Sequence, residues 1–240
     1  MTPNVPLLLL PGLAGGADCW GQPFLAALRR AGATPLLYAP PRDYSFARAV
    51  AAAAAQIERR GAPCAVLGWS MGAEVALRLA LERPELVASL VLCAACADQA
   101  ASAQRNAALR ELLEAPWPRW HELLMRAVMP QSLRERPAAA LNFMRLTAAR
   151  RTPDDALLWN AQREALKAAP PLNPVLPRIK QPALVCAGEH DLLFPPEEVE
   201  KLAAALPDAR FRLFPAGHAV MYDCPEELAQ TIAAFLAAVV

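Results

Sequence analysis

The chain has 240 residues, 55% of them hydrophobic and 20% charged, which provides enough apolar side chain for one sizeable core and excludes a disordered chain. Twenty-four Lys and Arg residues against 23 Asp and Glu residues leave a formal charge of +1, without the basic excess that is typical of nucleic-acid binding. The long apolar runs at the two ends are too short for the ~20 residues that a membrane span needs. We therefore expect a folded protein with no membrane span and no nucleic-acid partner.

Six apolar runs of strand length recur along the chain, and helix-like stretches separate most of them. Most of the runs lack polar alternation, which is typical of strands that helices cover on both faces of a parallel sheet. The pattern predicts the α/β class, with a mostly parallel six-stranded sheet flanked by helices. The expected strands are Val5–Leu10, Thr34–Tyr38, Cys64–Trp69, Val87–Ala95, Pro182–Ala187 and Arg210–Phe214.

The alternation of strands and helices stops between Asp98 and Pro177. Three or four amphipathic helices with proline breaks follow one another there. Because α/β sheets bind ligands at the carboxyl ends of their strands, helices inserted after the fourth strand would cover that edge. We predict a core domain formed by residues 1–97 and 178–240, with residues 98–177 inserted into it as a helical lid.

The chain contains six cysteines, most of them in or beside apolar runs, where a thiol packs as a small hydrophobe. This usage favours a reducing compartment and predicts a cytoplasmic protein. Cys93 and Cys96 form a C-x-x-C pair of the kind that binds metal or carries redox chemistry, yet neither a second pair nor a His-rich segment accompanies it. We interpret the pair as core packing and expect no metal site.

Gly68-Trp69-Ser70-Met71-Gly72 is a G-x-S-x-G motif between a predicted strand and a predicted helix. A serine in this context sits on a strained turn, and glycines on either side of it leave room for neighbouring backbone. A tight turn that merely contains serine is the alternative. A nucleophilic serine needs a histidine base and a carboxylate to orient that base.

Of the three histidines, His218 is the candidate base, and it follows the predicted strand Arg210–Phe214 in a turn that contains Gly217. His121 lies in the lid, where a helical surface role suits it, and His190 directly precedes Asp191. Asp191 follows the strand that ends at Ala187 and is the preferred carboxylate, with Glu189 as its rival on the same turn. All of these turns lie at the carboxyl edge of the predicted sheet.

With Ser70, Asp191 and His218 in this order, the chain resembles the α/β-hydrolase family over essentially its whole length. The resemblance extends to Leu8-Leu-Leu-Pro-Gly-Leu13, which matches the family's first oxyanion loop, although Pro11 stands where the family usually has histidine. It implies a serine hydrolase that cleaves carboxylic esters through an acyl-enzyme, with the backbone N–H groups of Leu13 and Met71 forming the oxyanion hole. It equally permits thioesterase, lactonase, C–C hydrolase or perhydrolase activity, and some proteins of this fold only bind ligands.

An apolar substrate pocket is expected between the sheet edge and the lid, which suits a small apolar ester and no cofactor. Helical spacing explains the lid residues equally well as packing within the lid. The expected lining residues are Trp20, Trp69, Leu124, Phe143, Leu146 and Trp159.

The lid carries eleven Arg and Lys residues against eight Asp and Glu residues, a mildly basic balance. Under such a lid, Gly68-Trp69-Ser70 is similar to the pimeloyl-carrier-protein methyl ester esterases of bacteria, which implies an acyl-carrier-linked substrate as one option. A solvated helix face explains the charges as well. The sequence is compatible with a monomer or a homodimer.

Overall fold

A computed structural model describes residues 5–128, 141 and 152–239 of the chain. Within these residues six strands form one sheet in the order β2-β1-β3-β4-β5-β6, and all neighbouring strands are parallel. This confirms the predicted α/β class, and the strand bounds lie within one or two residues of those expected. The strands are β1 (Val5–Leu10), β2 (Ala33–Leu37), β3 (Cys64–Trp69), β4 (Val87–Cys93), β5 (Ala183–Gly188) and β6 (Ala209–Phe214).

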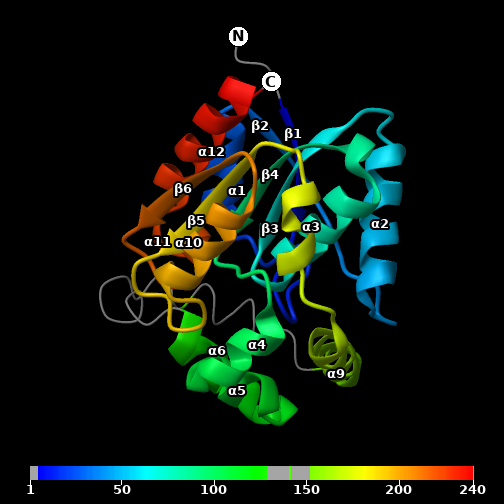
Figure 1. The fold of residues 1–240 in the computed structure, drawn as a ribbon. Coiled ribbons are helices and arrows are strands. Elements are labelled where there is room, and N and C mark those ends of the chain that lie inside the picture. The colour runs from blue at the N-terminus through cyan, green and yellow to red at the C-terminus, as the bar shows by residue number, and fades with distance from the viewer. Residues whose placement is uncertain (1–4, 129–140, 142–151, 240) are drawn as a thin grey trace.

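Helices cover both faces of the sheet (Figure 1). On one face α1 (Gln22–Arg30) contacts α12 (Pro225–Val239), and on the other α2 (Phe46–Glu58) contacts α3 (Met71–Glu82). The double cover leaves β3 and β5 buried along their whole length, which is why their sequences are continuous apolar runs. The remaining elements of the core are η1 (Pro84–Leu86), η2 (Asn173–Arg178), α10 (Pro196–Ala205) and α11 (Val220–Asp223).

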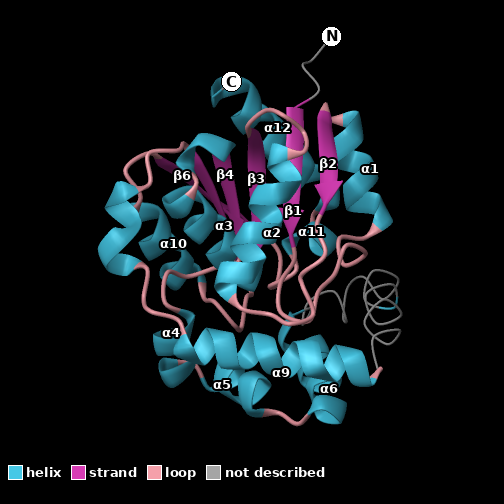
Figure 2. Ribbon diagram, turned by 90° about the vertical axis from the view of Figure 1, so that its right-hand side faces the viewer, coloured by secondary structure: helices cyan, strands magenta, loops and turns pink. Residues whose placement is uncertain are grey.

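The inserted lid lies in the chain between β4 and η2. Its described helices are α4 (Gln99–Arg105), α5 (Ala107–Glu114), α6 (Trp117–Val128) and α9 (Pro153–Ala168). Figure 2 shows these helices together beyond the carboxyl ends of the strands. No helix within the described residues has the length and apolar character that crossing a lipid bilayer requires.

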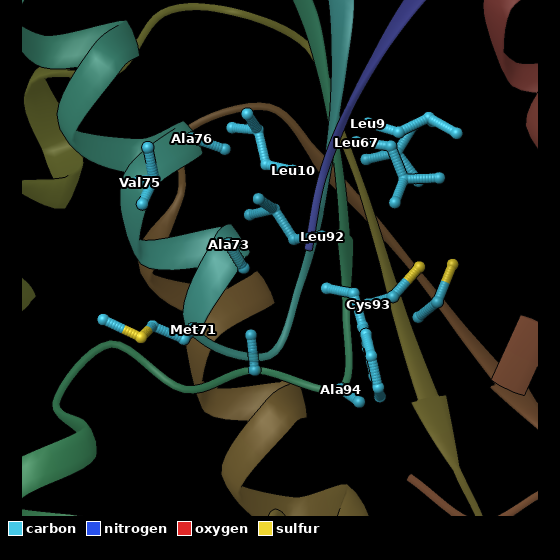
Figure 3. Packing of buried hydrophobic residues seen from close by; sticks show 14 of the residues in the cluster. Leu9, Leu10, Leu67, Met71, Ala73, Val75, Ala76, Leu92, Cys93 and Ala94 are labelled. Carbon is cyan, nitrogen blue, oxygen red and sulfur yellow. The ribbon is translucent and has the colours of Figure 1, made fainter. Parts of the chain in front are cut away.

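Helix α3, which follows β3 in the chain, packs closely against the sheet (Figure 3). Ala73 and Ala76 are fully buried beside Leu10 and Leu92. Such small side chains let the helix axis approach the strands, because there is little volume to separate them. The close packing fixes the turn between β3 and α3, where the candidate nucleophile lies.

Candidate active site

Ser70 forms the whole connection between β3 and α3. Its backbone torsions are φ 55° and ψ −121°, a combination that non-glycine residues rarely adopt. Two backbone bonds hold the turn: Ser70 N donates to Cys93 O at 2.9 Å, and Ala73 N donates to Ser70 O at 2.9 Å. This strained strand-to-helix turn is the geometry that projects a nucleophilic serine at the top of a sheet.

The two glycines of the motif are required sterically. A Cβ atom on Gly68 would lie 2.4 Å from Ala73 Cα, and one on Gly72 would lie 2.1 Å from Leu10 O. Gly12, in the loop after β1, is also close, because its Cβ would lie 3.3 Å from Ser70 Cβ. The glycines therefore allow the turn and the loop after β1 to meet at Ser70.

His218 and Asp191 form a buried pair at the ends of β6 and β5. His218 Nδ1 lies 2.8 Å from Asp191 Oδ2, and the two side chains are 2% and 0% exposed. Asp191 Oδ1 accepts from the backbone N–H groups of Leu193 at 2.8 Å and Phe194 at 3.0 Å, which fixes the carboxylate. Glu189 is exposed, so the structure pairs Asp191 with the histidine.

The loop that carries His218 is held by two further contacts. Asp223, which is 3% exposed, accepts from Gly217 N through Oδ2 at 2.8 Å. Trp69 Nε1 donates to His218 O at 2.9 Å and so ties this loop to the residue before Ser70. Sequence reasoning did not identify Asp223; an acidic residue ahead of the capped last helix is a weak signal for such a role.

Ser70 and His218 line the same cavity beneath the lid. The volume of this cavity is about 30 Å³. The other lining residues are apolar apart from one glutamine; they are Leu13, Trp69, Gln99, Leu109, Leu112, Leu113, Leu124, Leu166 and Leu193. A hydroxyl, an imidazole and, through the imidazole, a carboxylate thus converge on one apolar site.

A family model described as the alpha/beta hydrolase family matches residues 7–231, nearly the whole chain. The chain belongs to the alpha/beta hydrolase family. Its parallel sheet, the turn at Ser70 between β3 and α3, and the lid inserted after β4 agree with this membership.

Three relatives show what this hydrolase is similar to. A pimeloyl-[acyl-carrier protein] methyl ester esterase of Nitrosomonas europaea is 32% identical over 169 residues, which cover 68% of this chain and 67% of that protein. The crystal structure of BpoC from Mycobacterium tuberculosis H37Rv, which carries the name of a non-heme bromoperoxidase, has a TM-score of 0.82 at 25% identity and covers 100% of this chain and 94% of its own. A thermophilic esterase from Thermogutta terrifontis shares the fold, with a TM-score of 0.81 at 22% identity and coverage of 100% and 92%.

The two expected oxyanion donors of the hydrolase lie beside Ser70. Met71 is the first residue of α3, so its N–H group has no acceptor within the helix. Leu13 lies in a turn closed by a 2.9 Å bond from Gly15 N to Gly12 O, and its side chain lines the cavity. Their role as donors to an oxyanion remains a proposal.

The expected substrate-contacting residues of the hydrolase divide into three groups. Trp69 and Leu124 line the cavity. Trp20 is absent from that lining and packs edge-on against Trp69 with ring centroids 6.3 Å apart. Trp159, also absent from it, stacks on Trp120 within the lid at 4.9 Å. Phe143 and Leu146 lie outside the described residues.

Gln99 is a cavity residue that sequence reasoning missed. It is the first residue of α4 and is 4% exposed, and its Nε2 lies 3.4 Å from Ser70 O. The available signal was a polar residue at the start of the helix that follows β4, at the ligand-binding edge of the sheet. It places an amide group beside the candidate nucleophile.

The six cysteines of the hydrolase are buried and form no disulfide with one another. Cys93 of the C-x-x-C pair is in register with Cys186 on β5. Burial raises the pKa of the Cys96 thiol to about 12, which disfavours the thiolate that metal binding or redox chemistry needs. Across residues 5–128, 141 and 152–239, no three His, Cys, Asp or Glu side chains come together as a metal site would require.

Proposed function

We propose that this hydrolase cleaves carboxylic esters through an acyl-enzyme on Ser70. The observation that carries the proposal is the shared cavity of Ser70 and His218, with Asp191 2.8 Å behind the imidazole. A serine hydroxyl becomes a useful nucleophile at neutral pH only beside such an oriented base. The burial of the pair strengthens its electrostatic interaction, because little water screens it.

In the proposed reaction Ser70 Oγ attacks the ester carbonyl while His218 Nε2 takes the hydroxyl proton. Asp191 stabilises the imidazolium that forms. His218 then gives the proton to the departing alkoxide oxygen. In the second half of the reaction water attacks the acyl-enzyme while His218 takes its proton, and His218 returns that proton to Ser70 Oγ as the acid leaves. Backbone N–H groups of Leu13 and Met71 would hold the oxyanion, each contributing about 2.7–4 kcal/mol to transition-state stabilisation.

The size and lining of the cavity support a small group on one side of the ester. A water molecule needs about 10–15 Å³ of such space, so about 30 Å³ holds a group of only a few non-hydrogen atoms. The leucine walls exclude a charged group, because burying it without a partner is costly. A methyl or ethyl group in this cavity, with the longer part of the ester leading away, fits these limits.

We further propose that a methyl ester carried by an acyl-carrier protein is a substrate of this hydrolase. The support is the 32% identity to the pimeloyl-[acyl-carrier protein] methyl ester esterase of Nitrosomonas europaea, together with the mildly basic lid. The test compares one methyl ester in free form and linked to an acyl-carrier protein. A carrier-linked kcat/KM at least about tenfold above that of the free ester, falling with added salt, is expected from electrostatic association. Equal values would contradict the carrier proposal and leave the esterase proposal intact.

The esterase proposal is tested by labelling with a fluorophosphonate, followed by mass analysis of the modified peptide. Labelling on Ser70 and a loss of about 10⁶-fold in kcat for Ser70→Ala are expected. Ser89→Ala is the matched control, because Ser89 is also buried on β4 but does not line the cavity, and its hydroxyl has no hydrogen-bond partner among the described residues. Unlabelled protein with no turnover of p-nitrophenyl esters would instead favour a hydrolase-like binding protein.

The same fold permits cleavage of thioesters, lactones and C–C bonds and perhydrolysis. A panel of p-nitrophenyl acetate, an acyl thioester, a lactone and a peracid assay separates these reactions. We expect the highest kcat/KM for the short-chain ester. A thioester or lactone rate that exceeds it would reassign the reaction while keeping the roles of the three residues.

A further inference from the structure

A buried hydrogen bond joins the lid to the loop that carries the proposed oxyanion donor Leu13. Ala14 N donates to Oε1 of Gln162 at 2.8 Å. Gln162 lies on α9 and is 2% exposed, and Ala14 is 7% exposed. The two residues are 148 positions apart in sequence, so the bond exists only when α9 is seated on the core.

Ala14 has an unusual conformation for a residue with a side chain. Its φ is +55°, in the left-handed region that favours glycine. It occupies the third position of the turn that Gly15 N and Gly12 O close, and Leu13 at the second position is not among the positive-φ residues. A positive φ at the third position alone identifies a type II turn.

Alanine at that position favours the type I turn, in which the central peptide group is rotated by about 180°. The central peptide here is the Leu13–Ala14 group, and its N–H is the one that donates to Gln162. In the type I form this N–H would point away from the lid. The acceptor on α9 therefore selects the strained form of the turn over the form that the local sequence prefers.

We propose that Gln162 is a positioning residue that sets the oxyanion loop from the lid. The inference rests on the proposed esterase function, because it gives Leu13 a role in binding the oxyanion. When α9 is seated, the bond to Ala14 holds the turn in its type II form. Without the acceptor, the turn relaxes toward type I by rotation of the Leu13–Ala14 peptide. The Leu13 carbonyl turns with that peptide, and the adjoining Leu13 N–H is no longer held in one position.

The test uses Gln162→Met, which keeps the length of the side chain and removes the acceptor. We expect kcat per labelled Ser70 to fall about tenfold with KM little changed, a smaller loss than the about 10²- to 10³-fold found when an oxyanion donor is removed outright. Arg163→Met is the matched control, because the neighbouring Arg163 donates to Ala115 O at 3.1 Å and its loss loosens the lid away from the loop. The control should lower thermal stability comparably and leave kcat unchanged.

A rescue variant separates positioning from general damage to the lid. In Ala14→Gly combined with Gln162→Met, glycine adopts the positive φ without the help of Gln162. We expect the double variant to recover most of the lost kcat while its thermal stability stays low. A normal kcat in Gln162→Met, an equal loss in Arg163→Met, or a double variant no better than Gln162→Met would overturn the inference. If a fluorophosphonate does not label the wild-type protein and the protein does not hydrolyse esters, the proposed function is wrong. The role of Gln162 is then also refuted, because it depends on that function.

Discussion

Replacing Gly188 by alanine should damage catalysis without touching any of the three proposed catalytic residues. Gly188 is the last residue of β5, where the loop that carries Asp191 passes the loop that carries His218. A Cβ atom there would lie 2.2 Å from Gly217 O and 2.5 Å from Ala216 O. Ordinary contact begins at 3.4 Å, so the two loops must separate by about 1.2 Å.

The size of the effect follows from this displacement. Gly217 directly precedes His218, so the shift acts on the 2.8 Å contact between the imidazole and Asp191. A misplacement of about 1 Å in a catalytic constellation costs about 10²-fold in rate. Overpacking at a buried site also lowers the free energy of unfolding by about 1–3 kcal/mol. We therefore expect Gly188→Ala to fold and to lose about two orders of magnitude in kcat.

The assay measures kcat on p-nitrophenyl acetate, corrected for the fraction of Ser70 that a fluorophosphonate labels, together with urea unfolding. Gly61→Ala is the matched control, because a Cβ at Gly61 has nothing within 4 Å and the φ of +79° still makes alanine unfavourable. It should cost about 1–2 kcal/mol of stability and leave kcat unaltered. If Gly188→Ala keeps a normal kcat, the claimed coupling between the two loops is wrong.

Two further predictions concern buried ionisable groups. Burial raises the pKa of Glu74 above its ordinary 4.5, and Arg78, 2.7 Å away, opposes the shift. In Arg78→Met the pKa of Glu74 in the folded protein rises further. Above pH 4.5 the folded protein then keeps a proton on Glu74 that the unfolded chain has lost, so the free energy of unfolding falls as pH rises. Urea unfolding should show a deficit that grows with pH toward about 3–5 kcal/mol; a deficit independent of pH would contradict this account. Burial also raises the pKa of Cys64 to about 11 and of Cys96 to about 12, so iodoacetamide at pH 8 should leave these thiols unmodified until the protein unfolds, and rapid alkylation of the native protein would refute their burial.

Features that depend on residues close together in the sequence could be predicted from the sequence. The six strands follow from apolar runs of the right length, and their parallel arrangement follows from the missing polar alternation in runs such as β3. Ser70 and its two glycines were visible because a strained turn imposes a local steric pattern. Asp191 and His218 were found by their place after strands, which the parallel sheet brings to one edge.

Contacts between distant segments could not be predicted in this way. Asp223 and Gln162 act through hydrogen bonds whose partners are set by tertiary packing, and an acid or an amide in a helix carries no local sign of that role. The lid tryptophan Trp159 and the core residue Trp20 are as apolar as the residues that line the cavity. Hydrophobic patterning indicates that a side chain is buried, and the structure is needed to show whether it is buried against protein or against a vacant space.

The two ends of the lid meet on the core. Leu172 N, just before η2, donates to Ala97 O at 3.2 Å, so the chain that leaves β4 and the chain that returns toward β5 are joined at one point. The ends of the insertion can therefore remain in place whatever length of chain is spliced between them. The lid helices can therefore be exchanged, in evolution or by grafting. Such an exchange would change which substrates reach the cavity and would leave the candidate active-site residues on the core in place.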